Sequence, residues 1–354
     1  MIRLIFFWVC IGASGILYAD PAFSKKEPDA EAMKKIEDLC IMAKNINRSD
    51  CEYYADKILF EISQYEHKEK LFIPLSVAHL TKAYVCIKQH RQESEARKHS
   101  DAAEKLLPSI KEPEYHAHLL VDHCYISNQL KQEDVNRKAQ RIDRMILYFS
   151  DFISSEEYAG LERNRQLSML GYYASAVSIK LEFLMRNRPA GDESTEHFLR
   201  KTFAEIEKLS AGTLSESMCD CYDLAAFFYK RKQDPEKSFQ YAEKSLLLAE
   251  KHNIMPRRSS LILVDSASRA KEYEKALDYC RRSYQFFLDH PPVRDATIGN
   301  YYLVKGRIYY RMNDYKHAAE CLHKLEQLNL PADFAPAVKN FQKAMSSIRT
   351  PESN

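Results

Sequence analysis

The chain has 354 residues, of which 45% are hydrophobic and 29% are charged, with only 8 glycines and 13 prolines. Helix interiors exclude Gly and Pro, so this composition indicates a mostly helical protein. A formal net charge of +2 argues against a positive field over the whole molecule, and no nucleic-acid partner is expected.

The N-terminal stretch has one early cation, Arg3, followed by an uncharged and mostly apolar run that ends in small residues at Ala19. Because the run is short and polar sequence follows at once, it favours a signal peptide over residues 1–19, with an uncleaved anchor as the alternative. Residues 20–30 are then a linker. No later segment approaches the ~18 uncharged apolar residues of a membrane-spanning helix. We expect an exported chain without a membrane span, located in the periplasm or cell envelope of a Gram-negative bacterium.

From residue 31 onward, apolar residues recur at helical spacing in units that each predict two helices joined by a short turn. The seven units begin near residues 36, 77, 120, 164, 219, 257 and 299. Two of them are degenerate. In the third, Asp143 stands where an apolar residue is expected, and in the fourth the first helix is predicted to continue to Asn187 before a loop at 189–192.

The last unit, residues 299–332, has the clearest pattern. Tyr302, Gly306 and Tyr309 share one face of a first helix, and Asn313 with Asp314 breaks it. A second helix then carries apolar residues at helical spacing, with a small residue at Ala318. Small residues at Gly306 and Ala318 would let the two helices approach closely.

This order of large, small, aromatic, turn, aromatic and alanine positions resembles a tetratricopeptide repeat (TPR). The resemblance implies an all-α fold, an α-α superhelix described as a right-handed TPR-like solenoid of about seven helix pairs over residues 31–332. Residues 333–349 are predicted to form a capping helix, and residues 350–354 a disordered tail. A plain helical bundle is the alternative, but it does not require small residues at the same offset of each pair.

The sequence contains no phosphate-binding loop, zinc-binding helix or nucleophile elbow, so we expect no enzyme activity, no cofactor and no metal. The densest histidine group is His116, His118 and His123, and its spacing lacks the geometry of a zinc pair on a helix. Most cysteines lie in helical stretches as small apolar residues. A disulfide between Cys40 and Cys51 is possible after export.

In the TPR family, ligands usually bind the concave face, which the first helix of each pair lines. Along the first-helix positions that would line this face, basic residues outnumber acidic ones. The acidic residues are Glu37, Asp220, Asp223 and Asp265. The candidate peptide-binding residues are Lys44, Arg48, Lys88, Asn128, Lys131, Lys230, Arg231, Arg258, Arg269, Asn300, Arg307 and Arg311. The alternative interpretation is that long cations simply line a solvated groove.

These observations predict a non-enzymatic TPR scaffold of the bacterial cell envelope that binds a protein or peptide partner, with an acidic segment in its concave groove. A sensor or adaptor role in a signalling system fits that scaffold. The alternative function is a periplasmic protein that binds a small ligand or handles glycans. Nothing in the sequence indicates an oligomeric state.

Overall fold

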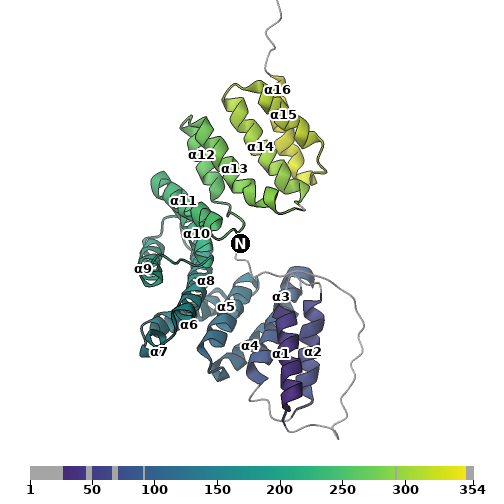
Figure 1. Cartoon of the computed structure of the whole chain (residues 1–354), viewed down its shortest axis with the longest axis vertical. Coiled ribbons are helices and arrows are strands. Elements are labelled where there is room, and N and C mark those ends of the chain that lie inside the picture. Colours follow the sequence, from purple (N-terminus) through teal and green to yellow (C-terminus); the bar gives the residue numbers. More distant parts are fainter. Residues whose placement is uncertain (1–26, 45–49, 66–70, 91, 292, 348–354) are drawn as a thin grey trace, which may run out of the picture. The chain divides into compact units, whose positions relative to one another are not determined.

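The computed structural model describes residues 27–44, 50–65, 71–90, 92–291 and 293–347. The predicted signal peptide, most of the linker, the C-terminal tail and Arg48 lie outside these residues. Within them the chain forms sixteen α-helices and three shorter helical turns, with no β-strand (Figure 1). The described chain therefore confirms the predicted all-α fold of consecutive helix pairs, an α-α solenoid.

The described chain divides into two compact units. Unit 1 comprises Met1–Asn187 and Thr202–Ser217, and unit 2 comprises Arg188–Lys201 and Met218–Asn354. The boundary passes through one helix, α9 (Glu193–Ser210), whose first half counts with unit 2 and whose second half counts with unit 1.

Unit 1 contains three complete helix pairs and the first helix of a fourth. Its helices are α1 (Ala30–Lys44), α2 (Cys51–Ser63), α3 (Phe72–Val85), α4 (Glu93–Leu106), α5 (Pro113–Gln129), α6 (Val135–Ile153), the short α7 (Glu156–Ala159) and α8 (Arg163–Asn187). A π-helical turn, η3 (Cys86–His90), follows α3, and a 3₁₀ turn, η4 (Leu107–Ser109), follows α4. The long α8 ends at Asn187 as predicted, where Arg188 and Pro189 begin the loop.

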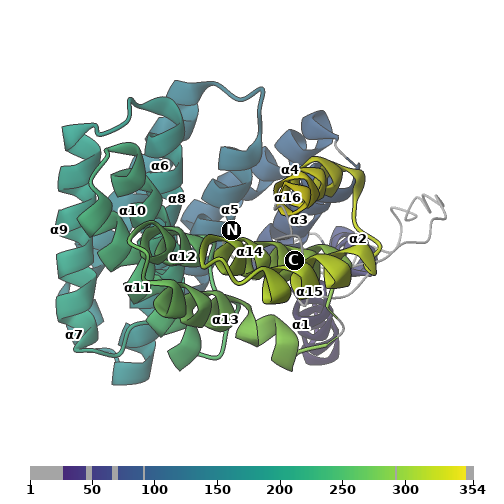
Figure 2. The ribbon, with the colours of Figure 1, turned by 90° about the horizontal axis from the view of Figure 1, so that it is seen from above.

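Unit 2 contains the three C-terminal helix pairs and one further helix, seen from a second direction in Figure 2. Its helices are α10 (Ser217–Arg231), α11 (Pro235–Lys251), α12 (Ser260–Arg269), α13 (Tyr273–Asp289), α14 (Asp295–Arg311), α15 (Tyr315–Glu326), the 3₁₀ turn η5 (Ala332–Phe334) and α16 (Ala335–Ser346). The predicted break at Asn313 and Asp314 is confirmed, since α14 ends and α15 begins on either side of it.

All three helix pairs of unit 2 turn through the same backbone geometry. A residue with positive φ follows each first helix, namely Gln233 (62°), Lys271 (62°) and Asn313 (61°). The next residue donates its backbone N–H to the carbonyl five positions earlier, at 2.9 Å in each turn. This Schellman arrangement satisfies carbonyls that the helix end leaves free. In two turns the side chain of that next residue, Asp234 or Asp314, then caps the second helix.

Small residues sit where the helices of the last pair are most crowded. Ala318 is fully buried, in a cluster with Leu303, Leu325 and Phe341. A Cβ atom added to Gly306 would lie 2.8 Å from the Phe341 ring and 3.0 Å from Cβ of Cys321. Gly306 therefore makes room for side chains from both α15 and α16, whereas the sequence pattern indicated only the approach of the second helix.

The capping helix predicted after the last pair corresponds to α16, which packs on both α14 and α15. Its central residue Phe341 is buried, and Ala337 and Met345 pack against the same cluster one turn away on either side. This face covers apolar surface at the end of the last pair, as a solenoid terminus requires.

Cysteines act as small apolar residues in the described chain. Of the eight cysteines in that part, seven are buried, while Cys40 is half-buried. Burial raises the pKa of the Cys124 and Cys280 thiols to about 12. The possible Cys40–Cys51 bridge is not formed. Within the described ranges, none of the helices has the combined length and apolar content that crossing a bilayer requires.

Candidate functional site

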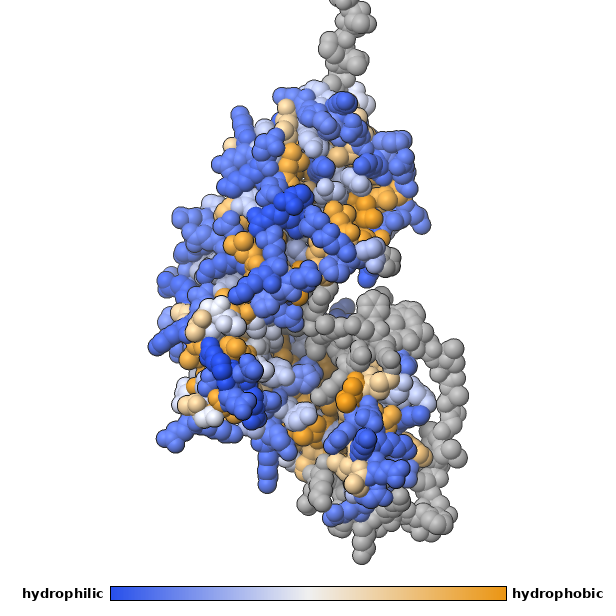
Figure 3. Space-filling view, in the orientation of Figure 1, coloured by the Kyte–Doolittle hydropathy of each residue, from blue (hydrophilic) through white to orange (hydrophobic). Residues whose placement is uncertain are grey.

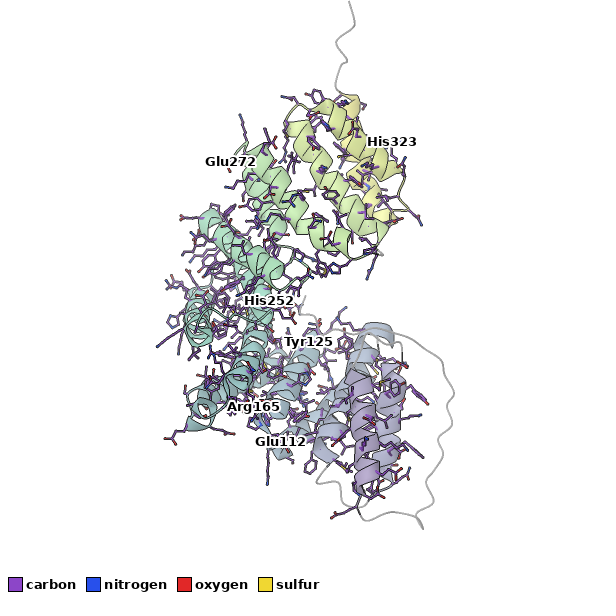
Figure 4. The ribbon with its side chains drawn as sticks, viewed as in Figure 1. Glu112, Tyr125, Arg165, His252, Glu272 and His323 are labelled. Atoms are coloured by element: carbon purple, nitrogen blue, oxygen red, sulfur yellow. The ribbon has the colours of Figure 1, made fainter. Side chains whose placement is uncertain are left out.

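The predicted binding residues of unit 1 have different environments. Lys44 is the last residue of α1, and Arg48 lies outside the described residues. Lys88 is exposed on η3, with its Nζ 5.7 Å from the ring centroid of Tyr84 and 5.8 Å from that of Tyr125, which Figure 4 labels. A cation at this distance from two aromatic rings is attracted to their faces, which holds Lys88 over the tyrosine pair.

Two further candidates of unit 1 lie at the α5–α6 turn. Lys131 is exposed. Asn128 is only 5% exposed, and its Nδ2 donates to Glu182 Oε2 at 3.4 Å. The structure therefore uses Asn128 to join α5 to α8 and does not present it on an open face. Arg165, labelled in Figure 4, is exposed but pairs with Glu114 at 2.5 Å.

In unit 2 every predicted binding residue is exposed. Four of these cations lie in the last turn of a first helix, where they oppose the negative end of the helix dipole; they are Lys230 and Arg231 on α10, Arg269 on α12 and Arg311 on α14. Arg258 precedes α12, and Asn300 and Arg307 lie within α14. Stabilisation of the helix ends therefore accounts for the positions of these four cations without any ligand.

Hydrogen bonds join consecutive first helices of unit 2. Asp223 Oδ1 accepts the backbone N–H of Ser259 at 2.7 Å, which ties α10 to the start of α12. Arg311 Nη1 donates to Ser268 Oγ at 2.7 Å, which ties α14 to the end of α12. Arg307 Nη2 donates to the carbonyl of Ala337 on α16 at 3.5 Å. The candidate cations of unit 2 thus lie on one continuous layer of first helices.

Two of the acidic residues on the predicted stripe are turned inward. Asp220 is 5% exposed and forms a buried ion pair with Arg257, in which Nε lies 2.7 Å from Oδ1. Burial raises the pKa of Asp220, and the guanidinium of Arg257 opposes that rise. Asp223 is 6% exposed and accepts the Ser259 bond. Neither carboxylate therefore reduces the positive charge of the exposed face, although both were expected there.

The exposed cations differ in whether an acid neutralises them. Arg269 pairs with Asp265 one turn earlier on α12, at 2.8 Å. Arg307 and Arg311 bond only to neutral oxygens, and neither pairs with a carboxylate of the described chain. Partial burial lowers the pKa of Arg307, and the positive charge of Arg311 lowers it further. These two guanidinium groups thus form an uncompensated positive pair.

Aromatic side chains lie on more than one face of α14. On α14, Lys305 Nζ lies 5.5 Å from the ring centroid of Tyr301 and 5.8 Å from that of Tyr309. Tyr310 is half-buried next to Arg311 and meets Tyr315 edge to face. Figure 3 shows apolar patches among the hydrophilic side chains over the C-terminal helix pairs. Tyr301 and Tyr309 lie on the other side of α14 from Arg307 and Arg311, so Tyr310, three residues after Arg307, is the aromatic neighbour of the arginine pair.

Metal ligands do not gather in the described chain, where no group of three or more His, Cys, Asp or Glu side chains could hold an ion. The three clustered histidines of α5 face different neighbours. His116 stacks on Tyr148 of α6, and His118 lies against Tyr172 of α8. His123 is buried.

No protein-family model matches the chain, and no curated protein matches it. Among solved structures, the chain is similar to one described as "Crystal Structure of Rap Protein Complexed with Competence and Sporulation Factor". The TM-score is 0.44 and the identity is 12%, over 90% of this chain and 99% of that chain. Similarity at this level carries no inference about a ligand, so the fold assignment rests on the helix pairs described above.

Proposed function

We propose that this protein is a non-enzymatic helical-repeat scaffold, and that unit 2 binds a carboxylate-bearing peptide segment of a protein partner. The observation that supports the proposal most is the uncompensated pair of Arg307 and Arg311 on α14. Residues four apart on a helix are neighbours, with Cβ atoms about 6 Å apart. Two guanidinium groups at that spacing can each donate two parallel hydrogen bonds to a carboxylate.

The supporting cations extend the same layer. Lys230, Arg231 and Arg258 are exposed on or beside α10 and α12, so an extended segment could cross several first helices. Arg269 contributes less, because a ligand carboxylate must compete with Asp265. In this proposal α14 supplies most of the affinity, and the earlier pairs add a general attraction that salt screens.

The test compares the parent chain with two variants of equal charge change. Arg307→Glu with Arg311→Glu reverses the proposed site, and Lys275→Glu with Arg281→Glu makes the same change on exposed positions of α13. The probes are a fluorescein-labelled glutamate-rich decapeptide and a lysine-rich one, followed by fluorescence anisotropy. We expect the acidic peptide to bind, and the α14 variant to weaken it at least tenfold, ~1.4 kcal/mol.

Binding should also weaken as salt is raised, and the α13 variant should bind like the parent. Equal binding by parent and α14 variant would remove the site from this face. Equal losses in both variants would reduce the interaction to net charge alone.

We further propose that the chain is exported and acts in the cell envelope as a sensor or adaptor. The support is the sequence of residues 1–19, an apolar run that ends in small residues. N-terminal sequencing of the mature protein should begin close to Asp20. An intact Met1 on a membrane-bound product would contradict cleavage.

A further inference from the structure

Unit 1 contains a partly open pocket that none of the predicted binding residues lines. Its volume is about 190 Å³, and it lies between the end of α4, α5 and α6. Its lining residues are Glu104, Leu107, Pro108, His116, Leu120, His123, Cys124, Arg141, Arg144 and Tyr148. The walls are therefore mainly apolar and aromatic, with a few polar groups.

One wall is an ion-pair network that is already satisfied. Arg141 is almost fully buried and bonds to Asp101, Glu104, Glu133 and Ser127. Although burial opposes ionisation, the hydrogen bonds and charge of Arg141 lower the pKa of Glu104 to about 2. These groups stabilise the α4–α5–α6 packing and have little capacity left for a ligand.

A polar group without a partner is buried behind the wall of the pocket. His123 is 1% exposed, and its Nε2 is buried without a hydrogen-bond partner in the described chain. Burial lowers the pKa of His123 to about 4, and the charge of Arg141 acts in the same direction, so the ring is neutral at pH 7. A buried polar atom left without a partner costs ~1–3 kcal/mol. Because Nε2 has almost no accessible surface, it is closed off from the pocket and does not contact a ligand there.

The outer end carries a charge that is free to interact. The Arg144 side chain is 69% exposed, and its bonds to Glu104 and to the Gln140 carbonyl are long, at 3.5 and 3.4 Å. His116 stacks on Tyr148 with ring centroids 4.7 Å apart, and this aromatic pair forms one side of the pocket. The pocket is thus mainly apolar, with a cation at its mouth.

We propose that this pocket binds a small aromatic carboxylate, with the ring against Leu120 and the His116–Tyr148 pair and the carboxylate at Arg144. The size agrees, since an apolar cavity of about 150 Å³ is enough to hold benzene and 190 Å³ leaves room for short substituents. Drug-sized ligands need pockets of ~300 Å³ or more, which excludes larger molecules. The site is independent of the peptide site in unit 2.

The test titrates the full chain with three probes by isothermal calorimetry. The probes are phenylacetate, pentanoate, which lacks the aromatic ring, and 2-phenylethanol, which lacks the carboxylate. We expect phenylacetate to bind best and each of the other two to bind at least fivefold more weakly. Failure of all three to saturate the protein at millimolar concentration would overturn the proposal.

Three variants locate the binding. Arg144→Gln should weaken phenylacetate binding at least fivefold and leave the neutral alcohol within twofold of the parent. Arg165→Gln, at an exposed arginine of α8 outside the pocket lining, should change neither. Leu120→Trp should fill the pocket and abolish binding of all probes, and retained binding in this variant would overturn the proposal.

A measurement on the unmutated chain covers the case in which Leu120→Trp does not fold. Nuclear Overhauser contacts are expected between the protons of the bound ring and the methyl groups of Leu107 and Leu120, both of which line the pocket. Binding without these contacts would place the ligand elsewhere and refute the assignment.

Discussion

Two glycines inside helices should respond differently to the same substitution. Gly171 lies in the interior of α8, where an added Cβ would meet Cβ of Ser215 at 3.6 Å, an ordinary contact. At Gly306 in α14 an added Cβ would lie 2.8 Å from the Phe341 ring and 3.0 Å from Cβ of Cys321. Real Cβ atoms essentially never come as close as 2.8 Å, so α16 or the ring must move.

The magnitudes follow from two opposing effects. Replacing Gly by Ala in a helix interior stabilises by ~1 kcal/mol, because Gly loses more backbone freedom on folding. Overpacking a filled core costs ~1–3 kcal/mol. Gly171→Ala should therefore stabilise its unit by ~1 kcal/mol, whereas Gly306→Ala should be neutral or destabilise by up to ~2 kcal/mol.

Hydrogen exchange is the suitable assay, because a repeat protein opens locally and a single melting temperature would average over its units. Amides of α8 should gain about fivefold in protection in the first variant. Amides of α14, α15 and α16 should lose protection, or show no gain, in the second. Equal gains in both variants would show that Phe341 moves aside without cost, and the reasoning from close contact would be wrong.

Three further predictions concern stability. Lys271→Gly should stabilise unit 2 by ~0.5–1 kcal/mol, because only Gly adopts positive φ without strain. Ala319→Gly, in the exposed middle of α15, should destabilise the same unit by ~1 kcal/mol, and urea titration measures both changes. Since the pKa of His123 is lowered to about 4 in the folded chain, the unfolded chain binds the proton first, and unit 1 should lose stability as the pH falls from about 6.5 towards 4. His123→Phe should remove that part of the slope in acid denaturation, and an unchanged slope would contradict the burial argument. Ala318→Leu should cost ~1–3 kcal/mol and raise hydrogen exchange first in α14 to α16, whereas loosening spread evenly over the chain would indicate a single cooperative bundle.

Local patterns in the sequence were sufficient to predict the helix pairs. The spacing of apolar residues and the Asn313–Asp314 break depend on near neighbours in the chain, and the helices of the last pair begin and end within a few residues of the expected positions. The first pair was placed less well, since α1 begins at Ala30 and the pattern indicated a start near residue 36. Apolar spacing marks the buried face of a helix but gives no sharp signal for its first turn.

The candidate sites depended on contacts that spacing cannot show. Asp220 and Asp223 share a helix face, and their position on the stripe indicated exposure, yet Arg257 and the Ser259 amide, more than thirty residues away, hold them inward. The pocket in unit 1 was missed for the same reason. At His123 the sequence shows a histidine among apolar residues on a helix, but a histidine in such a position is usually a packing residue. Only the placement of α4 and α6 shows that its Nε2 has no partner.

The buried thiols give this chain a built-in means to follow how its helix pairs open. Six of the seven pairs carry at least one buried cysteine, and the pair formed by α8 and α9 has none. The lack of solvent contact slows reaction with alkylating reagents in the folded chain, and at Cys51, Cys124 and Cys280 a raised thiol pKa slows it further. Each thiol should therefore be modified only when its own pair opens. Brief exposure to iodoacetamide, followed by peptide mass mapping, would then rank the pairs by opening rate without any mutation.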